Sequence, residues 1–123
     1  MATIHNIYAL LASVGVAPIY LEPIPATADP AIRINGPYMS EPVGDFTLIQ
    51  RKRYQIYTRG TDQWSVEELA NACYKALADA YPGGNEQTSE VEVLQAPSLM
   101  GTDDNGRFEY VFNISVAVWP KGD

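Results

Sequence analysis

The sequence predicts an α+β fold, a mainly antiparallel sheet of about four to five strands with two helices packed on one face. Apolar residues recur at helical spacing over 3–15 and 65–81, and they alternate with polar residues over 51–59 and 89–119. Two amphipathic helices and one sheet bury their apolar surfaces most simply when both helices cover the same sheet face. A chain of 123 residues can bury a sizeable core, so residues 1–123 are predicted to form a single domain.

The first helix is predicted over residues 3–15, with Thr3 as its N-cap and Gly15 just after its end. A proline-rich region follows, in which six of the nine prolines of the chain occur. Because proline lacks the N–H that a strand ladder needs, the extended pieces Ile19–Glu22 and Ala31–Asn35 are expected to be short or edge strands.

The whole extended region covers residues 18–50. Its last part, 36–50, is unusually apolar for a connecting segment. A solvated loop has no reason to gather so many large apolar side chains, and its prolines and glycines prevent a helix. It therefore either folds onto the sheet as a hairpin arm or offers apolar anchors to another subunit. These side chains are Tyr38, Met39, Val43, Phe46, Leu48 and Ile49.

The second helix is predicted over residues 65–81. Ser65 and Glu68 have the spacing of a capping box, in which each side chain accepts a hydrogen bond from the backbone of the other. Trp64 precedes this cap and is expected to pack on Leu69 as a hydrophobic staple.

The strand patterns at 51–59 and 89–119 predict one long strand and a hairpin. Asn105-Gly106 supplies the turn of the hairpin, because both residue types tolerate a positive φ. Alternation leaves polar side chains on the sheet face opposite the helices, where they are open to water or to a partner. They are Arg53, Gln55, Tyr57, Glu90, Glu92, Asn113 and Ser115.

No set of residues in the sequence is suited to catalysis. The only histidine, His5, lies beside the apolar stripe of a helix, and the only cysteine, Cys73, lies on an apolar helix face where a thiol is inert. The acidic run Asp103–Gly106 lacks the ligand spacing of an EF-hand and is interpreted as a hairpin turn. The chain is therefore predicted not to be an enzyme, to need no cofactor and to bind no metal.

The net charge of −7 opposes tight binding to nucleic acid, which requires lysine and arginine to displace counterions. It is compatible with a surface past which DNA slides without adhering. Four of the eight basic residues lie within 51–59, whereas acidic residues gather in the second half of the chain. This segregation allows one copy to dock on the next, although a solvated surface without a partner fits the charges equally well.

Two stretches of the chain resemble a known group of proteins. They are YQIYTRGTDQWSVEELANACYKAL and APSLMGTDDNGRFEYVFNISVAV. The shared features are a strand ending in Arg-Gly, an aspartate leading into an alanine-rich helix, an Asp-Asn-Gly-Arg turn and a closing strand with Asn113. The chain resembles the tail terminator or minor capsid proteins of long-tailed, siphovirus-like bacteriophages, more closely after residue 50 than before it.

This resemblance implies a virion protein of the tail or neck region that assembles in the cytoplasm of the bacterial host. Such proteins form a ring, typically a hexamer, that caps the tail tube, halts its polymerisation and docks on the head-side connector. The implied partners are further copies of the chain, the tail tube protein and the connector or stopper protein. DNA would only pass through the lumen, and no membrane is involved.

A ring joins two different patches of each subunit, so the basic strand is expected to meet acidic residues of a neighbour beside apolar anchors. Charge reversal at Arg51 and Arg53 should then leave a folded monomer that fails to assemble. Two alternatives stay open: another neck protein of similar fold, and a small monomeric module that binds a ligand or peptide on the open sheet face. The residues predicted at the subunit interface are Tyr38, Phe46, Ile49, Arg51, Arg53, Arg59, Asp103 and Asp104.

Overall fold

The computed structural model describes residues 4–14, 17–21, 23–25, 28–38, 40–43, 46–81 and 91–118. Within these ranges, only the backbone is described for 40–43, 46–49 and 118. The predicted helix ends Thr3 and Gly15, and the predicted face residue Glu90, lie outside the described residues.

Two helices and seven strands make up the described chain, and the α+β class is confirmed. The strands form one sheet in the order β1-β2-β4-β7-β5, with β3 also paired to β4 and β6 also paired to β7. Only the β1–β2 pair is parallel. The elements are α1 Ile4–Val14, β1 Ile19–Tyr20, β2 Ala31–Asn35, β3 Ser40–Val43, β4 Phe46–Gly60, α2 Gln63–Ala80, β5 Val91–Val93, β6 Ser98–Thr102 and β7 Phe108–Val118.

The long strands β4 and β7 form the centre of the sheet. They pair from Gln50 opposite Val118 to Gly60 opposite Phe108. Two shorter strands flank each side of this central pair. β2 and β3 both pair with the outer edge of β4, and β5 and β6 both pair with the outer edge of β7. The sheet has more strands than predicted because each edge carries two separate short strands.

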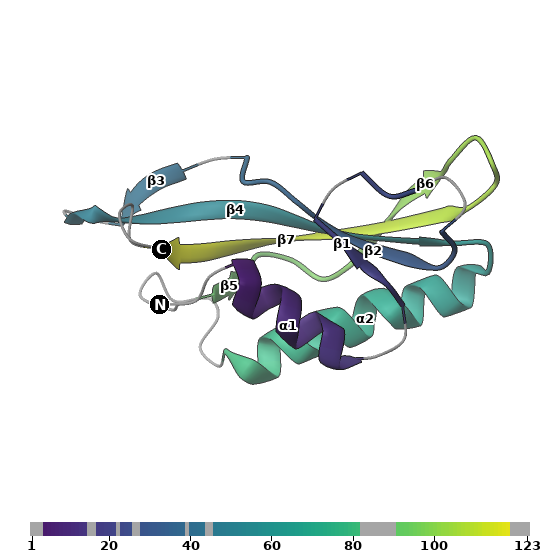
Figure 1. Ribbon diagram of the computed structural model, residues 1–123, viewed down its shortest axis with the longest axis horizontal. Coiled ribbons are helices and arrows are strands. Elements are labelled where there is room, and N and C mark those ends of the chain that lie inside the picture. Colours follow the sequence, from purple (N-terminus) through teal and green to yellow (C-terminus); the bar gives the residue numbers. More distant parts are fainter. Residues whose placement is uncertain are drawn as a thin grey trace.

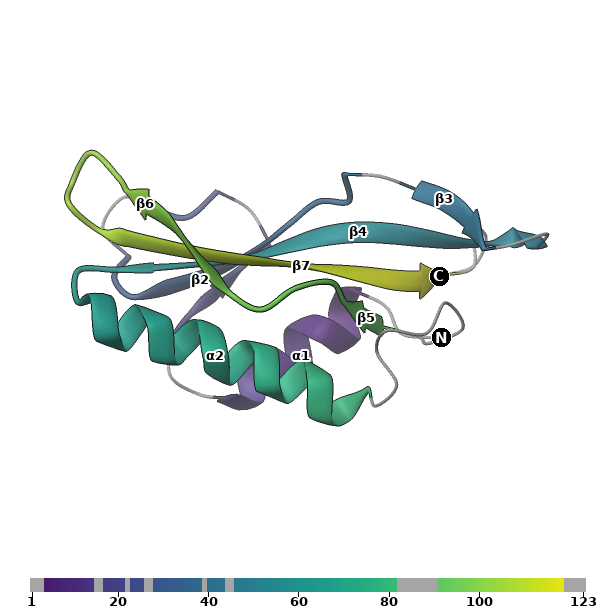
Figure 2. The ribbon, with the colours of Figure 1, turned by 180° about the vertical axis from the view of Figure 1, so that it is seen from behind.

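In Figures 1 and 2 both helices lie on the same side of the sheet. Their apolar residues and those of one sheet face make a large buried cluster, and Val66, Ala70 and Tyr110 form a smaller one. Within the large cluster the rings of Tyr74 and Phe112 meet edge to face, with centroids 5.7 Å apart, a favoured aromatic geometry. The buried members of the large cluster are Ile7, Leu11, Ile32, Ile34, Tyr54, Ile56, Leu69, Cys73, Leu77, Val91, Phe112, Ile114 and Val116.

Helix α2 begins two residues before its predicted start, and the predicted capping box is wrong. Its N-cap is Asp62, whose Oδ2 accepts hydrogen bonds from the backbone N of Ser65 (3.2 Å) and from Ser65 Oγ (2.5 Å). Because β4 ends at Gly60 and α2 begins at Gln63, only two residues separate strand from helix, and Asp62 occupies the N-cap position. The staple is also wrong: Trp64 lies within the helix and is 74% exposed, whereas Leu69 is buried.

The predicted hairpin loop contains a further strand, β6. The actual turn is shorter, with the Gly106 N–H donating to the carbonyl of Asp103 (3.0 Å). In this turn Gly106 has a positive φ (+75°). No described non-glycine residue has one, so Asn105 does not adopt the positive φ that was expected of it. The turn is instead held by Asp103 Oδ1, which accepts from the backbone N of Asn105 and of Arg107, both at 2.9 Å.

The apolar region before the central strand adopts a hairpin backbone. β3 pairs with β4, which therefore starts at Phe46, five residues before the predicted strand. In Figure 1, β3 and the first part of β4 extend past the ends of both helices. The structure does not describe the side chains of residues 39–49. Their role as apolar anchors for a neighbouring subunit therefore stays a prediction.

Candidate binding face of the sheet

The sheet face turned away from the helices is polar, and strand register brings its side chains into rows. Arg33 pairs with Tyr57, while Asn35 pairs with Gln55, which pairs in turn with Asn113. Side chains of paired residues point to the same face of a sheet. The face includes Arg33, Asn35, Arg53, Gln55, Tyr57, Arg59, Glu92, Glu109, Asn113 and Ser115.

Hydrogen bonds between side chains connect the strands across this face. Asn35 Nδ2 donates to Gln55 Oε1 at 3.1 Å, joining β2 to β4. The Tyr57 hydroxyl donates to Glu109 Oε2, joining β4 to β7. Burial, together with the bond to the Glu109 carboxylate, raises the pKa of Tyr57 to about 12, against a lowering by Arg59.

Pro25 and Ala28 are tied to this face at the end where β4 meets α2. Arg59 Nη2 donates to the carbonyls of Pro25 (2.7 Å) and Ala28 (3.3 Å). Arg107 Nη1 reaches the same Ala28 carbonyl at 3.5 Å. The Arg59 side chain thus binds the backbone of its own chain at Pro25 and Ala28, and 9% of the residue is exposed.

A pocket of about 340 Å³ lies on this face beside Pro23 and Ile24. Two guanidinium groups, one hydroxyl and two amides line it together with three apolar side chains, and its described walls include no carboxylate. Such a set of polar groups on an apolar background is typical of a binding site. The lining residues are Pro23, Ile24, Arg33, Asn35, Gln55, Tyr57, Arg59 and Met100.

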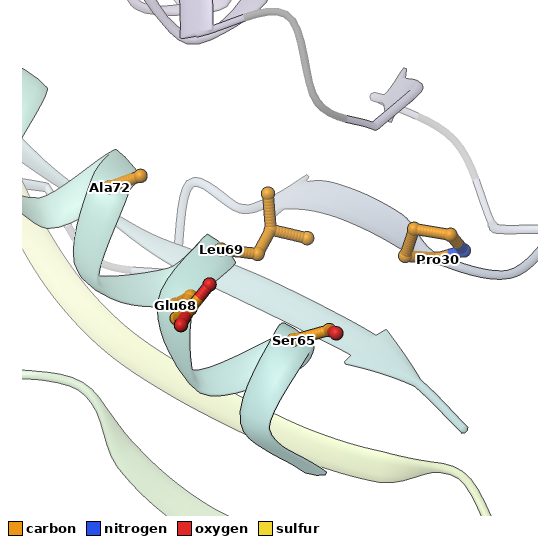
Figure 3. Close-up of a pocket in the computed structure, with 5 residues that line it drawn as sticks. All are labelled: Pro30, Ser65, Glu68, Leu69 and Ala72. Atoms are coloured by element: carbon orange, nitrogen blue, oxygen red, sulfur yellow. The ribbon is translucent and has the colours of Figure 1, made fainter. Parts of the chain in front are cut away.

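A second pocket, of about 330 Å³, lies on the flank of α2 beside the start of β2 (Figure 3). Leu69 and Pro30 supply apolar walls, and among its described lining residues only Glu68 is charged. Ser65 and Ala72 complete the lining. Because few polar groups are present to orient a ligand, we regard the arginine-lined pocket as the stronger candidate.

The predicted interface residues fall into two groups near opposite ends of the described part of β4. Arg51 and Arg59 are eight residues apart, which corresponds to about 26 Å along a strand. At the Arg51 end, Tyr38 is 62% exposed, and its backbone N–H donates to the carbonyl of Arg53 at 2.9 Å. Phe46 and Ile49 lie on β4 here, with side chains outside the description.

Arg51 contacts a carboxylate within its own chain. Its Nη2 lies 3.6 Å from Glu92 Oε2, and the exposed fractions of the two side chains are 5% and 25%. The two side chains meet diagonally across β7, since Arg51 pairs with Ala117 and Glu92 pairs with Ser115. Arg53 is half-buried on the same face.

At the other end, Asp103 also binds within the chain. Its Oδ2 accepts from Arg107 Nε at 2.7 Å. Hydrogen bonds from the Arg107 backbone hold the pKa of Asp103 below its ordinary value, with further lowering by the Arg107 side chain and the Asn105 backbone. Asp104 is exposed. Arg59 and Asp103 thus share one end of the sheet, linked through Arg107 and the Ala28 carbonyl.

The residues considered for catalysis are not brought together. His5 is exposed on α1, while Cys73 is buried on α2, where burial raises the pKa of its thiol to about 12. Among the described residues, no three histidine, cysteine or acidic side chains lie close enough to hold a metal ion. None of the described helices is both long enough and apolar enough to cross a bilayer.

Sequence reasoning missed the contribution of β2 and of segment 23–25 to the polar face. The β2 signal was available, because Ile32 and Ile34 alternate with Arg33 and Asn35. Nothing local in the sequence shows that Pro23–Pro25 packs beside them, since that contact depends on the tertiary path of the chain.

Comparison with known proteins identifies the family of the chain. The model of a family described as bacteriophage tail terminator protein matches residues 10–118. The chain belongs to this tail terminator family. Membership confirms the predicted resemblance, and makes the chain a structural protein of the phage tail, located in the virion.

A solved structure supports the same fold. A chain from the virion of a native gene transfer agent particle is similar to this terminator, with a TM-score of 0.59 and 16% sequence identity. The match covers 92% of this chain and 91% of that chain. No curated protein sequence matches this terminator.

Proposed function

We propose that this chain assembles into a ring that caps the phage tail tube, ends its polymerisation and joins the tail to the head-side connector. The observation that carries the proposal is the family match over residues 10–118. A ring of six copies follows from the group that the sequence resembles. Its partners are then the tail tube protein below and the connector or stopper protein above.

The projecting hairpin supports assembly into a ring. Because β3 and the start of β4 extend past both helices, neither helix of the same chain covers these two strand segments (Figure 2). Among described strands, β3 pairs only with β4, so its other edge is available to a neighbour. A contact of this arm with a different patch of the next subunit is heterologous, the type that closes a ring.

The predicted interface residues take different parts in this proposal. Exposed Tyr38 and Asp104 and half-buried Arg53 are assigned to direct contact with a neighbour, together with Phe46 and Ile49 on the arm. Arg51, Arg59 and Asp103 bind groups of their own chain. We therefore assign Arg51 and Asp103 to shaping the contact surfaces, whereas Arg59 also lines the pocket on the polar sheet face.

The acidic balance of the chain suits passage of DNA through the ring. With a net charge of −7 per copy, an acidic lumen would repel the phosphate backbone and prevent the genome from adhering. Purified chain should therefore show no tight binding to duplex DNA at physiological salt. High affinity under that condition would contradict an acidic lumen.

Polymerisation of the tail tube protein tests the proposed function. Added chain should shorten the tubes and place ring density at one end in electron micrographs. Tyr38→Asp should weaken both effects, whereas Tyr8→Asp, at an exposed tyrosine of α1, should not. Unchanged tube length without terminal density would refute capping and favour a monomeric ligand- or peptide-binding module. A ring found only on the connector would favour another neck protein of similar fold.

A further inference from the structure

Arg33 is an unpaired cation in a partly closed site. It makes no hydrogen bond or ion pair within the described part of the chain, and its Nε is buried without a hydrogen-bond partner. The side chain is only partly exposed and lines the pocket on the polar sheet face. Removing a guanidinium from water without a counter-charge is unfavourable, so this arrangement indicates that an anion completes the site.

The rest of the pocket strengthens this indication. Arg59 adds a second guanidinium, held in place by the carbonyls of Pro25 and Ala28. The nearest acidic group on this face, Glu109, accepts the hydroxyl of Tyr57 and does not line the pocket. The described walls therefore carry two positive charges and no negative one.

The shape and lining favour a carboxylate on an aliphatic stem. A guanidinium binds a carboxylate through two parallel hydrogen bonds. Pro23, Ile24 and Met100 provide apolar surface for methylene groups of the same ligand. The pocket of about 340 Å³ accommodates a side chain of that size. A DNA phosphate is disfavoured, because the chain as a whole carries a net charge of −7.

We propose that this pocket receives an aspartate or glutamate side chain from a second copy of the chain, which pairs with Arg33 and Arg59. The chain itself supplies the chemistry, since fifteen acidic residues stand against eight basic ones. The choice of a second copy rests on the proposed ring, in which one subunit presents its basic face to an acidic surface of the next.

A titration of the isolated chain tests the chemistry of the pocket. The probe is N-acetylglutamate methylamide, its uncharged control is the glutamine analogue, and the readout is the side-chain amide NMR resonances of Asn35 and Gln55, which line the pocket. Saturable shifts are expected with the glutamate probe alone, and affinity should fall about tenfold or more in Arg33→Gln. Lys75→Gln removes the same charge from the exposed side of α2 and should bind normally. Absence of saturable shifts, or stronger binding of inorganic phosphate, would overturn the carboxylate site.

Ring formation on tail tube ends tests the source of the carboxylate. Arg33→Gln should reduce the fraction of capped ends, and Lys75→Gln should leave it unchanged. Equal capping by both variants would overturn the second copy as occupant. If the wild-type chain forms no ring, both the proposed function and the second copy as the source of the carboxylate are refuted. The titration of the isolated chain still shows whether the pocket binds a carboxylate. Unfolding temperatures of the variants should match the wild type, because Arg33 has no partner to lose.

Discussion

Tyr57 on β4 donates its hydroxyl hydrogen to the Glu109 carboxylate on β7, diagonally across the sheet face that turns away from the helices. The register pairs Glu109 with Arg59 and Tyr57 with Val111, so this bond crosses between neighbouring rows. It fixes the one acidic group beside the arginine pocket and leaves the pocket walls positively charged.

Replacing Tyr57 with phenylalanine should destabilise the fold by about 0.5–1.5 kcal/mol, the net value of a hydrogen bond. The Glu109 carboxylate loses its donor, and no new group is introduced. Chemical denaturation followed by circular dichroism measures the effect. Tyr8→Phe, at an exposed tyrosine of α1, should change stability by less than about 0.5 kcal/mol. Equal stability of both variants would show that the Tyr57–Glu109 bond contributes nothing.

The raised pKa of Tyr57 also predicts a loss of stability at alkaline pH. Its folded value is about 12 and its ordinary value is 10.0, so the neutral hydroxyl is the form that the fold stabilises. The contribution is complete below pH 10 and is lost as the pH rises towards 12. Tyr57→Phe should lose less stability than the wild type across this window. Parallel profiles for the two proteins would contradict the assignment.

The start of α2 gives a test of which residue caps the helix. Asp62→Ala should cost about 0.5–2 kcal/mol, because the N–H of Ser65 loses its acceptor. Glu68→Ala should stay within about 0.5 kcal/mol of the wild type, because Glu68 is exposed and the N-cap is Asp62. A larger effect at Glu68 than at Asp62 would support the capping box predicted from the sequence.

This difference at α2 illustrates what local pattern can and cannot predict. Helical spacing located the buried stripe of Leu69, Cys73 and Leu77, because burial on one side of a helix requires that spacing. The exact start did not follow, since both Asp62 and Ser65 are good caps. The choice between them depends on where β4 ends, which pairing with β7 decides.

The candidate site was harder to predict than the fold. Alternation correctly placed Gln55, Tyr57 and Asn113 opposite the helices, because the side-chain period of a strand is two. The pocket also needs β2 in register with β4, and Pro23–Pro25 beside them. Such contacts between distant segments leave no periodic signal in a single sequence.

Cys73 should be chemically inert in the folded protein. Burial raises its pKa to about 12, so almost no thiolate is present at neutral pH. A thiol reagent should react only after denaturant is added. Cys73→Ser should cost about 1–3 kcal/mol, because it places a hydroxyl among apolar neighbours. Rapid labelling of the native protein would show that α2 opens more readily than its packing indicates.

Asp103 should make the β6–β7 turn sensitive to acid. Its folded pKa lies below the ordinary 3.8, so the stabilising contribution is complete above pH 3.8 and is lost as the pH falls through the lowered value. Asp103→Asn removes this dependence together with the Arg107 ion pair. Asp104→Asn is the matched control, because Asp104 is exposed and outside those bonds. NMR of the Gly106 amide as a function of pH would report the turn directly, and identical acid profiles would refute the role of Asp103.

Arg51→Glu should destabilise the monomer as well as any assembly. It places a second carboxylate against Glu92, and the lost pair is 3.6 Å apart with an almost buried guanidinium. We expect a cost of about 1–3 kcal/mol, less than for a fully buried pair because Glu92 is partly exposed. The charge-swapped Arg51→Glu, Glu92→Arg protein should recover part of this stability, as thermal unfolding would show. Arg53 shares a row with Glu92, because both pair with Ser115, so Arg53→Glu needs the same stability control before it is used to probe the subunit interface. If Arg51→Glu is as stable as the wild type, the ion pair is too weak to hold β5 against the sheet.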